Sequence, residues 1–190
     1  MLESALKYFI LGTTLSGFFI FGVILLYSCL GVTNFLYISH YFSIVDIKTM
    51  SNISIIIINI AILFIVVSFL FKIGAAPFHQ WTVDVYEGIS FFMMIYFSTI
   101  VKFVFIMTFI RILGYVFIDV FVICSYILKI SGLLCLFVGS FGGLVQKKIK
   151  RFFAYSSISH LGFILLALSS GDLIGIQAAI FYTPISFSCS

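Results

Sequence analysis

The segment FKIGAAPFHQWTVDVYEG, residues 71–88, places ionisable side chains beside residues that break helices. Lys72 ends a long apolar run, and Gly74 and Pro77 follow it closely. Because proline lacks an amide hydrogen and clashes with the preceding turn, a helix must break near Pro77. A break frees backbone carbonyls, and such backbone is tolerated at membrane depth only where it lines protein or water. Lys72 is therefore a candidate proton-transfer group; the alternative is a lysine that caps a helix C-terminus.

A second lysine, Lys102, lies near the middle of the apolar run from Ile89 to Leu113. A lysine at the bilayer centre costs about 2.5–3.5 kcal/mol on insertion scales, and its amine reaches the interface from there with difficulty. Ser98 and Thr99 precede it by one turn and are expected on the same face. Burial favours the neutral amine and a nearby carboxylate favours the ammonium form, so such a lysine can switch its charge. The alternative is a lysine that only hydrogen-bonds a neighbouring helix.

The sequence AYSSISH adds His160 to this set. Ser156 and Ser157 precede the histidine by one turn, so the three side chains predict a polar seam along one helix. A proton relay through His160 is the functional interpretation, and a hydrogen-bonded structural histidine is the alternative. Lys129 is a third lysine within an apolar run, and its role is open: it is either a third buried lysine or a lysine that reaches a polar neighbouring chain.

The other polar and reactive residues favour structural roles. Trp81 and Tyr86 are typical of an interfacial aromatic belt, and Asp84 and Glu87 are expected to face water or to cap the next helix. Four cysteines without metal-type spacing are expected to be apolar fillers, and no cofactor or metal is expected in this chain. The cysteines are Cys29, Cys124, Cys135 and Cys189.

Composition indicates that the elements holding these residues are membrane helices. The chain is 63% hydrophobic and only 8% charged, with a mean hydropathy of +1.31, whereas about 25% of a soluble domain is charged. Since a spanning helix needs roughly 20 apolar residues, we predict an all-α integral membrane protein of about six helices in a single membrane domain, residues 1–190. The predicted helices cover approximately 6–30, 53–78, 89–113, 116–145, 152–168 and 173–190, with a polar connection at 31–50.

Two further expectations concern packing and orientation. Gly12 with Ser16 and Thr13 with Gly17, at four-residue spacing, predict close contact of the first helix with a neighbour. The basic residues divide five against two between the two sides of a six-helix arrangement, which predicts that the N-terminus and the QKKIKR link face the cytoplasm or the matrix. The five are Lys7, Lys147, Lys148, Lys150 and Arg151, and the two are Lys48 and Arg111. The absence of a signal or transit peptide pattern would suit synthesis in an organelle or a bacterium.

FKIGAAPFHQWTVDVYEG, STIVKFVFI and QKKIKRFFAYSSISHLGF together resemble the antiporter-like membrane subunits of respiratory complex I, NADH:ubiquinone oxidoreductase, and most of all the subunit 2 branch of that family. The resemblance covers essentially the whole chain. It implies a fold of two inverted repeats of five helices, each with one broken helix, which moves protons and carries no redox centre. It also implies that Lys72 is the broken-helix lysine, that Lys102 is the central lysine of the next helix, and that residues 147–160 are the basic link and the histidine-bearing helix, with Arg151 in the family's basic pair.

The sequence also departs from that family. The family pairs its broken-helix lysine with a glutamate from an earlier helix, and Glu3 is a poor substitute for it. The second broken helix is not found after the sixth predicted helix. The chain therefore resembles an internal portion of the subunit, from a split or truncated gene, and other membrane-arm subunits are expected to supply the missing glutamate helix and the second broken helix.

The leading hypothesis is a proton-translocating piece of complex I in the mitochondrial inner membrane, with its N-terminus and QKKIKR link on the matrix side. Lys72, Lys102 and His160 would form the relay, and Gly74 and Pro77 the helix break. NADH and quinone chemistry would belong to partner subunits, and lipids, but no nucleic acid, are expected as further partners. The alternatives are a scaffold subunit that no longer pumps and a subunit of a multi-chain cation/proton antiporter.

Overall fold

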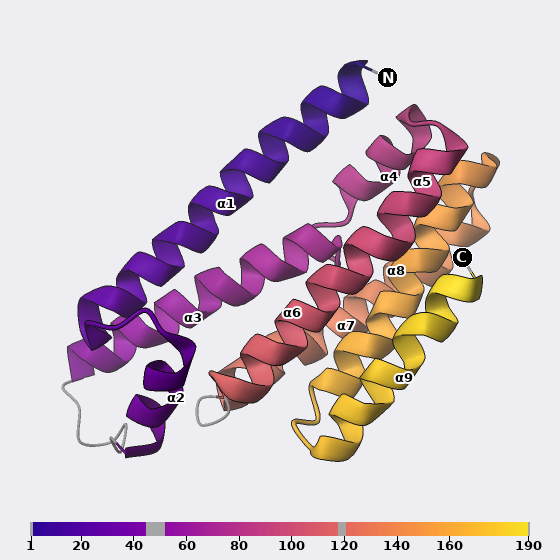
Figure 1. Ribbon diagram of the computed structural model, residues 1–190. Coiled ribbons are helices and arrows are strands. Elements are labelled where there is room, and N and C mark those ends of the chain that lie inside the picture. The colour runs from indigo at the N-terminus through magenta and orange to yellow at the C-terminus, as the bar shows by residue number, and fades with distance from the viewer. Residues whose placement is uncertain (1, 45–51, 118–120, 190) are drawn as a thin grey trace.

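In the computed structural model, which describes residues 2–44, 52–117 and 121–189, every element of secondary structure is helical (Figure 1). Five described helical segments are long and apolar enough to cross a membrane, which agrees with the predicted all-α membrane fold. The apolar part of the last helix, Leu173–Pro184, is shorter. In chain order the helices are α1 (Leu2–Leu30), α2 (Phe35–Ile44), α3 (Asn52–Ile73), α4 (Gln80–Gly88), α5 (Phe91–Tyr96), the π-helix η2 (Phe97–Val101), α6 (Lys102–Tyr115), α7 (Phe121–Leu144), α8 (Ile149–Leu168) and α9 (Leu173–Cys189).

Two groups of helices form the bundle. In Figure 1, α1 and α3 lie side by side in indigo and purple, and α7, α8 and α9 pack together in orange and yellow. The short helix α4 contacts both α1 and α8, and α6 contacts α3. The segment expected to be a polar connection contains the additional short helix α2, whose buried side chains Ile38 and Phe42 belong to the apolar core.

The predicted helix break lies between α3 and α4. Helix α3 ends at Ile73, and Gly74 follows with a φ of 80°, a conformation that favours glycine. A Cβ atom at Gly74 would also lie 2.3 Å from Cγ2 of Thr82, so the break requires glycine there for two reasons. The peptide bond between Ala76 and Pro77 is cis, and α4 begins at Gln80.

Polar groups freed by the break find partners. The indole Nε1 of Trp81 donates a hydrogen bond of 3.0 Å to the carbonyl oxygen of Phe71. The amide of Ala76 donates to Sγ of Cys135 on α7, also at 3.0 Å. A buried backbone group without a partner is costly in an apolar environment, so these contacts stabilise non-helical backbone inside the bundle.

Close approach of the helices depends on glycines other than those expected. Within the described part of the chain, no atom of another helix lies within 4 Å of a Cβ built at Gly12 or Gly17, so these residues make no close helix contact there. Instead, Gly22 packs against α3, where its Cβ would lie 3.0 Å from the carbonyl oxygen of Ala61. Between α7 and α8 a Cβ at Gly162 would lie 2.9 Å from the carbonyl oxygen of Gly132. Spacing of small residues alone does not tell which face of a helix meets a neighbour.

Candidate functional site

A cavity of about 90 Å³ lies between α1, α3, α4 and the segment from η2 to α6. Both Lys72 and Lys102 line it, although 30 residues separate them in the chain. The volume is sufficient for a few water molecules, at roughly 15 Å³ or more for each. Its other walls are mostly apolar and aromatic: Tyr8, Leu11, Gly12, Leu15, Trp81, Val85, Tyr86, Phe97, Val101 and Phe105.

Lys102 is the most buried ionisable amine of this site, with 4% of the residue exposed. It lies eleven residues after Phe91 and twelve before Gly114 in a 24-residue spanning segment, so it is near the middle, as predicted. Its amine donates a hydrogen bond of 2.9 Å to the hydroxyl of Ser157 on α8. The same amine lies 5.6 Å from the ring centroid of Tyr86, within the range of a cation–π contact.

The residues that precede Lys102 form one turn of π-helix. Ser98 and Thr99, expected to share the face of the lysine, both donate to the carbonyl oxygen of Ile95, at 3.0 and 2.8 Å. A π turn widens the helix and is frequent at functional sites. Because both of these hydroxyls bond to the backbone, the hydroxyl that accepts from Lys102 comes from another helix, at Ser157 of α8. The sequence pattern identified Ser157 only as a neighbour of His160.

Lys72 lies in the last turn of α3 and lines the cavity among aromatic rings. Its amine lies 5.5 Å from the centroid of Phe19 and 5.6 Å from that of Phe105. No carboxylate forms an ion pair with it within residues 2–44, 52–117 and 121–189. Glu3 pairs with Lys7 at 3.0 Å, and so it does not serve as the partner of Lys72.

His160 lies one turn beyond Ser157 on α8, and Nδ1 of its ring is 2.9 Å from the hydroxyl of Tyr182 on α9. The two rings are 6.0 Å apart, centroid to centroid. Ser157 in turn donates to the carbonyl oxygen of Ala154 at 2.7 Å. Polar side chains from α6, α8 and α9 thus follow one another across the bundle. The sequence pattern did not single out Tyr182, because it lies on a different helix from His160, and helical periodicity relates residues only within one helix.

The two aromatic residues of α4, Trp81 and Tyr86, line the cavity. Tyr86 is buried, with 2% of the residue exposed, and it lies over the amine of Lys102. Trp81 lines the cavity, and its ring stacks on Phe71 with a centroid distance of 6.4 Å. Burial of the side chain contradicts the belt interpretation for Tyr86, whereas Trp81 is half-buried and its belt role stays a prediction.

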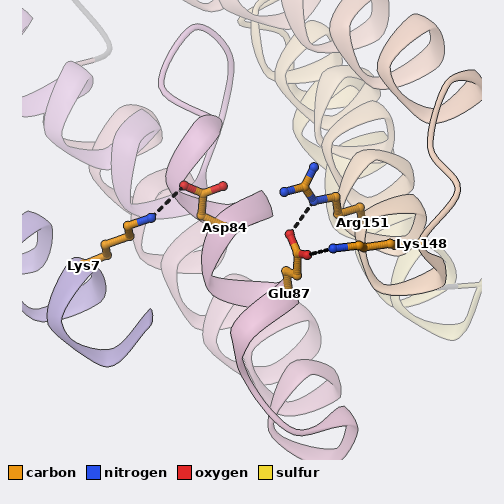
Figure 2. A network of polar contacts seen from close by, with 5 residues as sticks. All are labelled: Lys7, Asp84, Glu87, Lys148 and Arg151. Atoms are coloured by element: carbon orange, nitrogen blue, oxygen red, sulfur yellow. Dashed lines mark hydrogen bonds and ion pairs between the residues drawn. The ribbon is translucent and has the colours of Figure 1, made fainter. Parts of the chain in front are cut away.

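The outer side of α4 carries ion pairs to two other helices (Figure 2). Asp84 accepts a hydrogen bond of 3.2 Å from Lys7 of α1. Glu87 pairs with both Lys148 and Arg151, at the start of α8. The Lys148 ammonium, and next the Arg151 guanidinium, lower the pKa of the Glu87 carboxyl by hydrogen bonding to its charged form. These contacts bring the first turns of α1, the end of α4 and the QKKIKR link together at one end of the bundle.

The described residues contain no group of three or more His, Cys, Asp or Glu side chains that could hold a metal ion. Cys29, Cys124 and Cys135 are free thiols, and the side chain of Cys189 lies outside the described residues. Cys135 does more than fill space, since its sulfur accepts the hydrogen bond from Ala76 at the break. Lys48 also lies outside the described residues.

The fold and the cavity define a polytopic helical membrane protein with ionisable side chains gathered at the level of a helix break. The family described as NADH:quinone oxidoreductase/Mrp antiporter, TM, matches residues 1–189. The chain therefore belongs to this family of membrane subunits, as its motifs predicted.

Individual relatives agree with this assignment. NADH-ubiquinone oxidoreductase chain 2 of Rhizopus oryzae is 37% identical over 180 residues, which cover 95% of this chain and 33% of the relative. A chain of respiratory complex I from Thermus thermophilus has a TM-score of 0.64 and 28% identity over 98% of this chain and 39% of its own length. A chain of the Mrp complex from Dietzia has a TM-score of 0.84 with 19% identity, covering 98% of this chain and 33% of that one. This chain thus spans about a third of the length of these proteins, and its similarity to chain 2 agrees with the predicted subunit 2 branch.

Proposed function

We propose that this chain is the lysine-bearing part of a proton-translocating membrane-arm subunit of an NADH:quinone oxidoreductase. The observation that carries the proposal is the cavity shared by Lys72 and Lys102, with Lys102 buried at mid-span and hydrogen-bonded to Ser157. An ionisable side chain inside a spanning segment is costly and is typical of ion and proton pathways. The name and sequence of the chain 2 relative support the same assignment.

In the proposed mechanism the two lysines exchange protons through water in the cavity. A carboxylate from another polypeptide segment approaches Lys72 and holds it as an ammonium ion; withdrawal of that carboxylate releases the proton toward Lys102. The aromatic walls of the cavity limit the number of water molecules in it, so the proton follows a defined route between the two lysines. Lys102 passes the proton toward His160, with the Ser157 hydroxyl between α6 and α8 and the Tyr182 hydroxyl beyond.

The remaining roles follow from this assignment. The chain works beside other membrane-arm subunits, holds no cofactor of its own and leaves NADH and quinone chemistry to its partners. We place it in the mitochondrial inner membrane, with the first turns of α1 and the QKKIKR link on the matrix side. The basic residues there, Lys7, Lys148 and Arg151, lie at the same end of the bundle, which fits the positive-inside rule.

Replacing Lys102 with methionine in the assembled complex tests the proposal. Methionine preserves the length and removes the amine, so the number of protons moved per electron pair is expected to fall, while assembly and electron transfer to an artificial acceptor persist. Lys147→Met, which removes an exposed amine of the link, is the matched control. Normal pumping by a fully assembled Lys102→Met complex would contradict the proposal and favour a scaffold role. Dependence of transport on Na⁺ without NADH oxidation would favour the antiporter alternative.

A further inference from the structure

Lys129 is a lysine in a spanning helix that faces out of the bundle. It lies eight residues after Phe121, the first residue of the 24-residue spanning helix α7. At 1.5 Å per residue its backbone is about 12 Å from the start of the helix. This depth falls within the apolar core of a bilayer, which is roughly 30 Å thick. Lys129 is nevertheless exposed, whereas Leu128 beside it is buried.

Among the described residues, little compensates the charge of the Lys129 amine. The recorded contact is with the ring of Tyr126, 5.7 Å from its centroid, and that residue is itself 63% exposed. No carboxylate among the described residues pairs with Lys129. An ammonium ion on the outer face of a spanning helix is costly unless another polar group covers it.

The surroundings of Lys129 form a continuous face of α7. Val122, Tyr126, Leu133 and Phe137 are all exposed, and with Lys129 they follow at steps of four, three, four and four residues. This spacing keeps them on one side of the helix. We name these five residues the Lys129 face; it is an apolar ridge with a single positive charge within it.

We propose that the Lys129 face is the docking surface for a spanning helix of a neighbouring subunit, and that this helix carries an aspartate or glutamate at the depth of Lys129. Charge complementarity selects this occupant, because a purely apolar helix would leave the ammonium ion unpaired in hydrocarbon. The inference does not rest on proton transfer, since Lys129 does not line the cavity of Lys72 and Lys102.

Photo-cross-linking in the native membrane tests which molecule covers this face. A photoreactive amino acid at Leu133 or Tyr126 is expected to give one discrete adduct with another membrane subunit. The same group at Ile24, exposed on α1, measures the background from a different face. Adducts with lipid alone at both α7 positions would overturn the proposal and show that the lysine serves lipid headgroups.

Charge variants then test the carboxylate. Lys129→Arg keeps the charge and is expected to assemble as the wild type does, whereas Lys129→Glu is expected to reduce the assembled fraction roughly fivefold or more, because like charges across an interface repel. Exchanging the carboxylate of the cross-linked helix for lysine is expected to restore assembly of the Lys129→Glu variant, which separates a lost contact from a misfolded chain. Equal assembly of the Glu and Arg variants, or no rescue by the exchange, would overturn the proposal.

Discussion

The amine of Lys102 donates its hydrogen bond to Ser157, 55 residues further along the chain, across the contact between α6 and α8. Ser157 in turn donates to the carbonyl of Ala154, so the hydroxyl is oriented to accept from the lysine. Both residues are buried. The pair joins the helix that follows the π turn to the helix that carries His160.

Ser157→Ala is expected to slow proton pumping in the assembled complex. Loss of the acceptor leaves the buried Lys102 amine without its hydrogen bond, at a cost of about 1–3 kcal/mol. Each 1.4 kcal/mol added to the activation free energy of proton transfer slows that step about tenfold. Ser156→Ala is the matched control, since that hydroxyl bonds to the backbone of Phe153. The measurement is the initial rate of acidification driven by NADH in proteoliposomes; equal rates in the two variants would remove Ser157 from the pathway.

Tyr182→Phe is expected to change the pH dependence of pumping. The phenol hydroxyl lies 2.9 Å from Nδ1 of His160, and a hydrogen bond at one ring nitrogen determines which tautomer the other nitrogen offers. Its loss is expected to shift the midpoint of the pH–rate profile while leaving assembly intact. Tyr37→Phe, at an exposed tyrosine of α2, controls for loss of a hydroxyl. An unchanged profile in Tyr182→Phe would show that His160 does not act as a relay.

Gly74→Ala is expected to prevent stable assembly. A non-glycine residue at a φ of 80° costs roughly 1–2 kcal/mol, and the added Cβ would meet Cγ2 of Thr82 at 2.3 Å. Thr82→Ser removes this methyl group, so the double variant is expected to regain part of the assembled fraction. Gly17→Ala, where no atom lies within 4 Å, is the control. Native electrophoresis measures the assembled fraction; normal assembly of Gly74→Ala would contradict a rigid break.

Glu87→Gln is expected to loosen α4 near neutral pH and to have no effect in acid. Because Lys148 and Arg151 lower the pKa of the Glu87 carboxyl, its pairing contributes fully above the usual range of a glutamate. This contribution is lost as the pH falls through the lowered pKa, where the wild type also becomes neutral. Hydrogen exchange of residues 80–88, compared with the wild type at each pH, measures the change. Asp172→Asn, at an exposed aspartate, is the control; a difference that persists unchanged in acid would contradict the prediction.

The sequence alone determined which segments enter a membrane and where one of them breaks. Low charge and long apolar runs leave burial in lipid as the only stable solution for such segments. Pro77 and Gly74 constrain the backbone locally, whatever surrounds them. The mid-span position of Lys102 could also be predicted, because the rise per residue of a helix is constant and depth follows from the residue count.

Only the tertiary structure decided which side chains meet. Ser157 became the partner of Lys102 because α8 comes within hydrogen-bonding distance of α6, and Tyr182 became the partner of His160 because α8 packs against α9. The helical period tells which residues share a face, but in a chain apolar on all sides it does not tell which face turns inward. Tyr86 turned inward over an amine, and Lys129 turned outward from the bundle, by the same packing and not by any local preference of their sequence.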